Sequence, residues 1–132
     1  GFPGETEQDF EQTLQIAGRV KYINSYCFKY SPRPHTAAAL MPNQISDQIK
    51  SERLQRLDSK LNEIQREFNT SCIGKTMLCL YDGPDKTGRN AIYRTPYMQP
   101  CIVKNISDTP GDLINIKITD ANKATLYGET SD

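Results

Sequence analysis

Four cysteines are the residues of this sequence with the most obvious potential for metal or redox chemistry. Cys27, Cys72, Cys79 and Cys101 are separated by 45, 7 and 22 positions. This spacing matches neither a paired C-x-x-C zinc pattern nor the cysteine density of a small disulfide-bonded scaffold. We therefore expect free thiols in a reducing compartment, and we assign no metal site to them.

One histidine limits the acid–base chemistry that the chain can perform. His35 is the only histidine, so a Ser–His or Cys–His catalytic pair would have a single available base. No cluster of metal-ligating residues lies near it in the sequence. Because His35 stands between Pro34 and Thr36 in a segment of turn-forming residues, we interpret it as a surface residue and assign no catalytic residue to the chain.

The composition indicates a globular chain of about one domain. Its 132 residues include 36% hydrophobic and 24% charged residues, with sixteen acids and sixteen bases, and this excludes collagen and coil-only chains. The longest apolar run, Ala37 to Met41, is far shorter than the roughly 20 residues that cross a bilayer. The balanced charge gives no electrostatic signature of nucleic-acid binding. Because the first residue is Gly1 and not Met, we expect an upstream part that is absent here.

The first 70 residues combine helix and turn signals. Thr6 and Asp9 have the spacing of a capping box, which predicts a helix that begins at Glu7 and stops at Gly18. Residues 23–30 are rich in aromatic side chains and are interpreted as a strand that ends before two prolines. This order of turn, helix and strand is typical of a repeat in a β/α protein.

The strongest helix signal covers Asp47 to about Phe68. Ser46 is the expected N-cap. The helix is interpreted as packing one stripe on a core, in preference to a coiled-coil dimer, because the heptad pattern is short. Its apolar positions repeat at intervals of three and four residues, at Leu54, Leu57, Leu61, Ile64 and Phe68.

The remaining residues, 71–132, are typical of an all-β domain. Short runs of strand-forming residues alternate with turns that contain Gly, Pro, Asn and Asp. Five short strands in about 60 residues favour a small closed barrel, a form that many oligonucleotide-binding proteins share. The expected strands cover 76–81, 91–94, 101–104, 113–119 and 125–129.

Several motifs in a fixed order resemble the C-terminal part of the radical-SAM methylthiotransferase family, in its tRNA-modifying branch. The match includes Gly-Phe-Pro-Gly-Glu-Thr at 1–6, Phe-Lys-Tyr-Ser-Pro-Arg-Pro at 28–34, Glu-Arg-Leu at 52–54, Arg-Thr-Pro-Tyr-Met-Gln-Pro at 94–100 and Leu-Tyr-Gly-Glu at 126–129. The resemblance implies that residues 1–70 are the end of an incomplete radical-SAM β/α barrel with a linking amphipathic helix. It implies that residues 71–132 are a TRAM-like RNA-binding β-barrel.

The same resemblance implies a function for the parent enzyme. It would add a methylthio group to C2 of N(6)-isopentenyladenosine next to the anticodon, using S-adenosylmethionine and two [4Fe–4S] clusters in the cytoplasm. The cysteines that ligate these clusters in the family lie upstream and are absent from this chain, which is therefore not expected to be active alone. The chain also departs from the family at His35 and Tyr93, where the family normally has glycine, and this puts a tight turn and a close backbone approach in question.

Seven residues are the candidates for binding. If the first half belongs to a β/α barrel, the end of its last strand faces the ligand, so Tyr30, Ser31 and Arg33 are candidates for contact with S-adenosylmethionine. On the second half, cations and an exposed aromatic residue would hold phosphates and stack a base. The expected RNA-binding residues are Lys75, Arg94, Tyr97 and Lys104.

Three alternatives remain open on the sequence. The chain could be a free-standing RNA-binding barrel without catalysis, a part of a ribosomal-protein methylthiotransferase, or a truncated product with no independent role. The partners expected under the leading hypothesis are tRNA, S-adenosylmethionine and the missing N-terminal part of the same enzyme, with no membrane.

Overall fold

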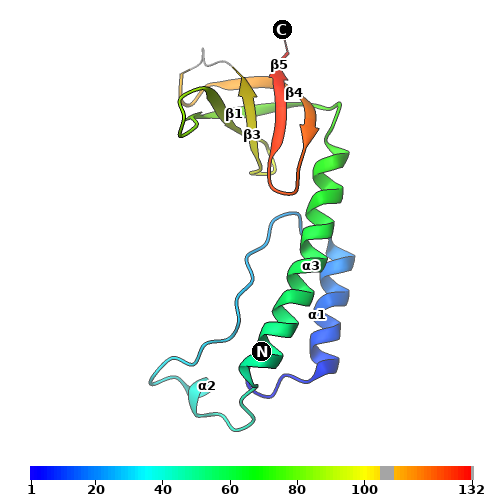
Figure 1. The fold of residues 1–132 in the computed structure, drawn as a ribbon, viewed down its shortest axis with the longest axis vertical. Coiled ribbons are helices and arrows are strands. Elements are labelled where there is room, and N and C mark those ends of the chain that lie inside the picture. The colour runs from blue at the N-terminus through cyan, green and yellow to red at the C-terminus, as the bar shows by residue number, and fades with distance from the viewer. Residues whose placement is uncertain (105–108, 132) are drawn as a thin grey trace. The chain divides into compact units, whose positions relative to one another are not determined.

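The computed structural model describes residues 1–104 and 109–131 and contains three helices and five strands within them (Figure 1). It separates into two compact units, Gly1–Gln65 and Arg66–Asp132, each described below by itself. The sequence placed the boundary after residue 70. The elements are α1 (Glu7–Val20), α2 (Ala37–Leu40), α3 (Asp47–Ser71), β1 (Thr76–Pro84), β2 (Asn90–Arg94), β3 (Pro100–Lys104), β4 (Leu113–Ala121) and β5 (Leu126–Thr130).

Helix α1 begins as the sequence predicts and ends later than predicted. The Thr6 backbone N–H donates to Asp9 Oδ2 at 2.8 Å, and the Asp9 N–H donates to Thr6 Oγ1 at 3.2 Å, which completes the capping box. The stop at Gly18 is wrong, because the helix continues to Val20. Lys21 ends it by adopting the left-handed conformation, with φ of 56°, and donating its N–H to the Ala17 carbonyl.

Helix α3 also begins as predicted, because Ser46 Oγ accepts the Ile49 N–H at 3.3 Å. In the first unit, Leu57 and Leu61 of α3 line one hollow together with Ile16 and Ala17 of α1. This unit has a small core, since the buried hydrophobic side chains within it are Phe10, Ala17, Leu61 and Ile64.

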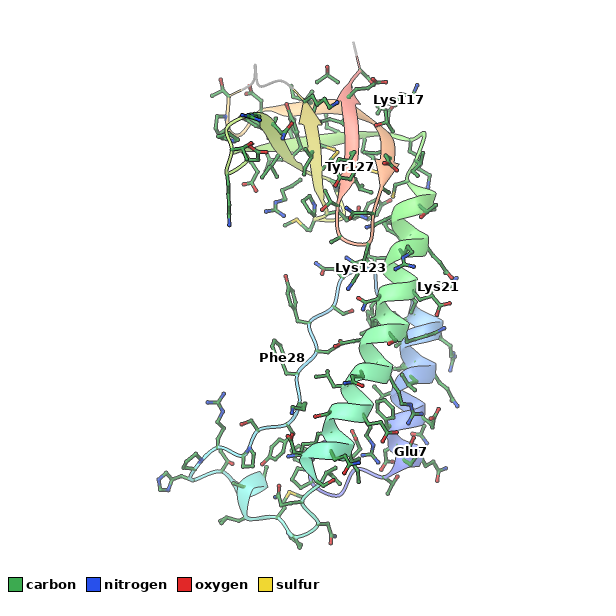
Figure 2. All side chains as sticks on the ribbon, viewed as in Figure 1. Glu7, Lys21, Phe28, Lys117, Lys123 and Tyr127 are labelled. Atoms are coloured by element: carbon green, nitrogen blue, oxygen red, sulfur yellow. The ribbon has the colours of Figure 1, made fainter. Side chains whose placement is uncertain are left out.

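The strand predicted over residues 23–30 is absent, and the prediction is wrong for this chain. The described residues before Thr76 contain no strand. A strand needs a neighbour that pairs with its N–H and C=O groups, and the described residues provide none for this segment. Its Tyr26 and Phe28 side chains are 84% and 85% exposed, and Figure 2 shows Phe28 projecting from the segment. Aromatic composition alone could not reveal the missing neighbour.

The five strands of the second unit form a closed barrel, as the sequence predicts, and the structure shows their order to be β1-β2-β3-β5-β4. Strands β3 and β5 are parallel, and the other neighbours are antiparallel. Pairing of β1 with β4 and of β3 with β5 closes the sheet, and alternate residues point inward to form the core. The barrel core consists of Cys72, Cys79, Tyr81, Ala91, Tyr93, Cys101, Val103, Ile116, Ile118 and Leu126.

The turn between β1 and β2 is organised by one carboxylate. Asp85 accepts the Thr87 N–H at 3.0 Å, the Thr87 hydroxyl at 2.8 Å and the Asn90 side-chain amide at 2.7 Å. Hydrogen bonds from the Asn90 and Thr87 side chains hold the pKa of Asp85 well below its usual range. The ionised carboxylate is therefore part of the folded turn.

Replacing Asp85 by asparagine is expected to lower the melting temperature at pH 7 by a few degrees and to have little effect at low pH. Because folding lowers the pKa of Asp85, its ionised form stabilises the fold above the ordinary aspartate pKa of about 4, and this contribution is lost as the pH falls below it. Thermal unfolding of both proteins between pH 7 and pH 2 measures the difference. An equal difference in melting temperature at pH 7 and at pH 2 would contradict the stabilising role of the ionised Asp85 carboxylate.

Candidate nucleic-acid interface

The three expected cofactor-binding residues lie together in sequence but differ in environment. Ser31 and Arg33 are exposed. The Tyr30 ring packs edge-to-face on Phe2 with centroids 5.4 Å apart. Lys50 Nζ lies 5.1 Å from the Tyr30 ring centroid and donates to the Tyr30 carbonyl at 3.2 Å. Tyr30 is thus partly packed into the first unit, and Ser31 and Arg33 face solvent.

His35 is exposed, as the sequence predicts, and its backbone adopts the conformation for which the resemblance leads us to expect glycine. Its φ of 65° lies in the left-handed region, where glycine has no steric penalty and other residues do. The tight turn is therefore retained in spite of the side chain. Thr36 follows as the N-cap of α2, a single-turn helix that the sequence analysis missed.

Arg94 and Tyr97 lie at the same end of the β2–β3 hairpin. Arg94 Nε donates to Asp82 Oδ2 at 2.9 Å in an exposed ion pair. The Tyr97 ring is 48% exposed and packs edge-to-face on Phe68, with centroids 5.0 Å apart. Tyr97 therefore has packing support from one side and a surface open to solvent.

Lys104 and Lys75 are separated from that pair. Lys104 faces Asn90 in the register of β2 and β3, whereas Arg94 faces Pro100; the four-residue interval corresponds to about 13 Å along the strand. Lys75 immediately precedes β1, on the side of the barrel that pairs with β4. The four expected RNA-binding residues thus lie on one barrel but do not form a single patch.

Sequence reasoning missed cations in the loops. Lys86 and Arg89 lie in the β1–β2 turn, beside the Asn90–Lys104 end of the hairpin, and Lys123 lies in the β4–β5 loop labelled in Figure 2. In the described part of the chain none of these three cations forms an ion pair. The sequence signal for an exposed turn with two cations is Asp-Lys-Thr-Gly-Arg-Asn at 85–90. The sequence analysis puts the turn at 82–84, and the structure shows these residues to be part of β1.

A depression of about 690 Å³ on the outside of the barrel lies next to this end of the hairpin. Strands β3 and β5 pair there over three residues. The depression is lined by an aromatic ring, a cation, hydrogen-bonding groups and two carboxylates, from residues that include Tyr127, Lys104, Asn90, Asp120 and Glu129. These chemical types can contact both the bases and the phosphates of a nucleic acid.

The cysteines do not fit an iron–sulfur cluster. Burial raises the pKa of Cys79 to about 11 and that of Cys101 to about 12, with a further contribution from Cys79 to the latter. Both side chains lie in the barrel core, where they are protonated at neutral pH, whereas cluster ligands are thiolates. Within residues 1–104 and 109–131, no group of three or more His, Cys, Asp or Glu side chains could hold a metal ion.

Curated relatives match almost the whole chain. The proteins from Rickettsia rickettsii (strain Sheila Smith) and Rickettsia prowazekii (strain Madrid E) are 48% and 47% identical to it over 98% of its length, and both are named tRNA-2-methylthio-N(6)-dimethylallyladenosine synthase. The chain is homologous to the C-terminal part of these synthases. It spans 29% of the length of the synthases it matches.

Other comparisons add little to the synthase match. No family model matches the chain. The apo form of Mycoplasma genitalium RNase R aligns with 67% of this chain and 20% of its own, with 14% identity and a TM-score of 0.37. None of the described helices is long and apolar enough to cross a membrane.

Proposed function

We propose that the chain is the tRNA-binding C-terminal part of a methylthiotransferase that adds a methylthio group to C2 of N(6)-isopentenyladenosine next to the anticodon. The observation that carries this proposal is the 48% identity to the named synthases over 98% of the chain. The chemistry would belong to the upstream part, which would hold two [4Fe–4S] clusters, and the reaction would take place in the cytoplasm. The role of this chain would be to bind and orient the substrate RNA.

The barrel of the second unit would act as a TRAM-like domain. Its topology supports this role, because small five-stranded barrels commonly bind oligonucleotides across strands 2 and 3 and the adjoining loops. Lys86, Arg89 and Lys104 place three cations at one end of that surface, and Arg94 and Tyr97 lie at the other. The RNA backbone would follow the outer face of β2 and β3 between them.

The first unit would complete the catalytic domain. Residues 23–30, which form no strand here, would pack against the upstream part, because Tyr26 and Phe28 expose large apolar rings. Tyr30, Ser31 and Arg33 would then contact S-adenosylmethionine, which supplies the methyl group and the radical. The exposure of Ser31 and of Arg33, whose guanidinium has no ion pair among the described residues, leaves both available.

RNA binding by the 132-residue chain tests the proposal. We expect it to bind an anticodon stem-loop that contains N(6)-isopentenyladenosine, with an affinity that falls as salt rises. Replacing Arg94 or Lys104 by alanine should weaken binding severalfold and reduce the salt slope by about one. Fluorescence anisotropy at several salt concentrations measures both quantities.

The matched control is Arg19→Ala, which removes an exposed cation from the last turn of α1 in the first unit. Its affinity should equal that of the parent chain. If the parent chain shows no salt-dependent binding, the proposed function of the barrel is wrong. If Lys75→Ala alone weakens binding, the interface lies on the β1–β4 side instead.

A further inference from the structure

A buried network of polar side chains joins two loops of the barrel to the end of α3, and the proposed function does not use it. Asn69 is fully buried and donates from Nδ2 to the carbonyls of Asn122 and Lys123, at 2.9 and 3.0 Å. Its Oδ1 accepts a hydrogen bond from Gln99 Nε2. The Gln99 Oε1 in turn accepts the Thr95 hydroxyl at 3.1 Å. One asparagine therefore connects the β2–β3 hairpin with the β4–β5 loop.

The hairpin held by this network presents apolar side chains to solvent. Met98 is 65% exposed and Tyr97 is 48% exposed. Met98 has a φ of 66°, a conformation that is unfavourable for a residue other than glycine and that persists only where its surroundings enforce it. The enforcing contacts are the Met98 N–H to the Thr95 carbonyl at 2.9 Å and the Thr95 N–H to the Gln99 carbonyl at 3.1 Å.

The charge of the two loops favours an anionic partner with flat rings. Residues 95–99 and 121–125 contain one cation, Lys123, and no carboxylate. Tyr97 is supported edge-to-face by Phe68 and offers a ring to solvent, and Lys123 is exposed without an ion pair among the described residues. Asn69 joins the two loops that carry this ring and this cation, and an aromatic ring together with a cation can bind an unpaired base and its phosphate.

We propose that the 95–98 hairpin and the 122–125 loop form one binding surface for an unpaired nucleobase of RNA, with Asn69 and Gln99 as its positioning residues. This proposal rests on RNA binding by the barrel and names the part of the RNA that is read there. Tyr97 stacks on the base, Met98 covers its edge and Lys123 contacts the adjoining phosphate. Asn69 touches no RNA and acts by holding the two loops in register.

A double-mutant cycle in the full 132-residue chain tests this proposal, using a fluorescent single-stranded adenosine oligonucleotide and a blunt RNA duplex as probes. Well below the melting temperature, Asn69→Ala and Tyr97→Ala should each weaken single-strand binding about tenfold, the effect of losing one stacked base. In the Tyr97→Ala background, Asn69→Ala should have no further effect. The salt slope for Asn69→Ala should equal that of the parent chain, because no phosphate contact is removed.

The matched control is Asn62→Ala, on the same helix in the first unit. It should bind as the parent chain does. Circular dichroism at the assay temperature checks that each variant is folded. If Asn69→Ala fails to fold, Gln99→Glu is the second variant, because it loses the amide donor to Asn69. Unchanged affinity in the folded variants, or effects of Asn69→Ala and Tyr97→Ala that add, would overturn the proposal. Absence of RNA binding by the parent chain would instead refute the proposed function.

Discussion

Replacing Gly128 by alanine is expected to destabilise the barrel by about 1 to 3 kcal/mol, the usual cost of overpacking a core. Gly128 lies on β5, opposite Ile118 of β4 and Val103 of β3. A Cβ atom there would come within 2.5 Å of Ile116 Cγ2 and 2.7 Å of the Lys117 carbonyl oxygen. The carbonyl belongs to the paired backbone, so the clash can be relieved only by shifting a strand. Gly128→Val should be worse and should prevent closure of the barrel.

Urea unfolding followed by circular dichroism, together with hydrogen exchange of the barrel amides, measures this effect. Gly18→Ala is the matched control, because Gly18 lies inside α1 and an added Cβ would meet only Lys60 Cε at 3.5 Å. Alanine there should stabilise the first unit by about 0.5 to 1 kcal/mol through its higher helix propensity. A Gly128→Ala barrel as stable as the parent would show that β4 and β5 are further apart than described.

Replacing Arg53 by alanine is expected to destabilise the first unit by about 3 kcal/mol, the range for breaking a buried ion pair. The Arg53 side chain is 9% exposed, and its Nη1 donates to Glu5 Oε1 at 2.7 Å and to the Glu5 carbonyl at 3.1 Å. Its guanidinium also lies 5.7 Å from the centroid of the buried Phe10 ring. The substitution would remove the packing and leave the Glu5 carboxylate, which is 21% exposed, without this partner.

Arg56→Ala is the internal control for this prediction. Arg56 is also on α3, pairs with Glu7 and Glu11 and lies over the same Phe10 ring, but its side chain is 36% exposed. Solvent already screens its ion pairs, so the loss of stability should be much smaller. Thermal unfolding of both variants, with hydrogen exchange of the α1 amides, compares them. Equal losses of stability in the two variants would show that the number of ion pairs, and not their burial, determines the stability of this unit.

Local interactions made much of the fold predictable from sequence. The capping box at Thr6, the N-cap at Ser46 and the stripe from Leu54 to Phe68 depend on residues three or four positions apart, and all produce the expected elements. Short runs of strand-forming residues between turn residues placed all five strands. The end of α1 was misjudged because Lys21 accepts a backbone conformation that its residue type disfavours.

The candidate site was less predictable because it depends on register. The sequence identifies three cations, Arg94, Lys104 and Lys75, in or next to the strands of a predicted barrel. Only the strand pairing shows that they lie on separate parts of it. Lys86 and Arg89 are exposed because β1 ends at Pro84 and both residues lie in the turn that follows it. No sequence pattern indicates the role of Asn69, because its hydrogen-bond partners at residues 99, 122 and 123 are distant in sequence.

The sequence by itself determined the positions of two long helices, the five strands and the closed barrel, because hydrophobic period and capping are written in neighbouring residues. It also carried the family resemblance that the relatives bear out. Only the tertiary structure decided that residues 23–30 have no strand partner here, that Cys72, Cys79 and Cys101 are buried thiols and that Asn69 joins two loops. Each of these depends on which distant segments meet, and that is set by packing and hydrogen bonding across the chain.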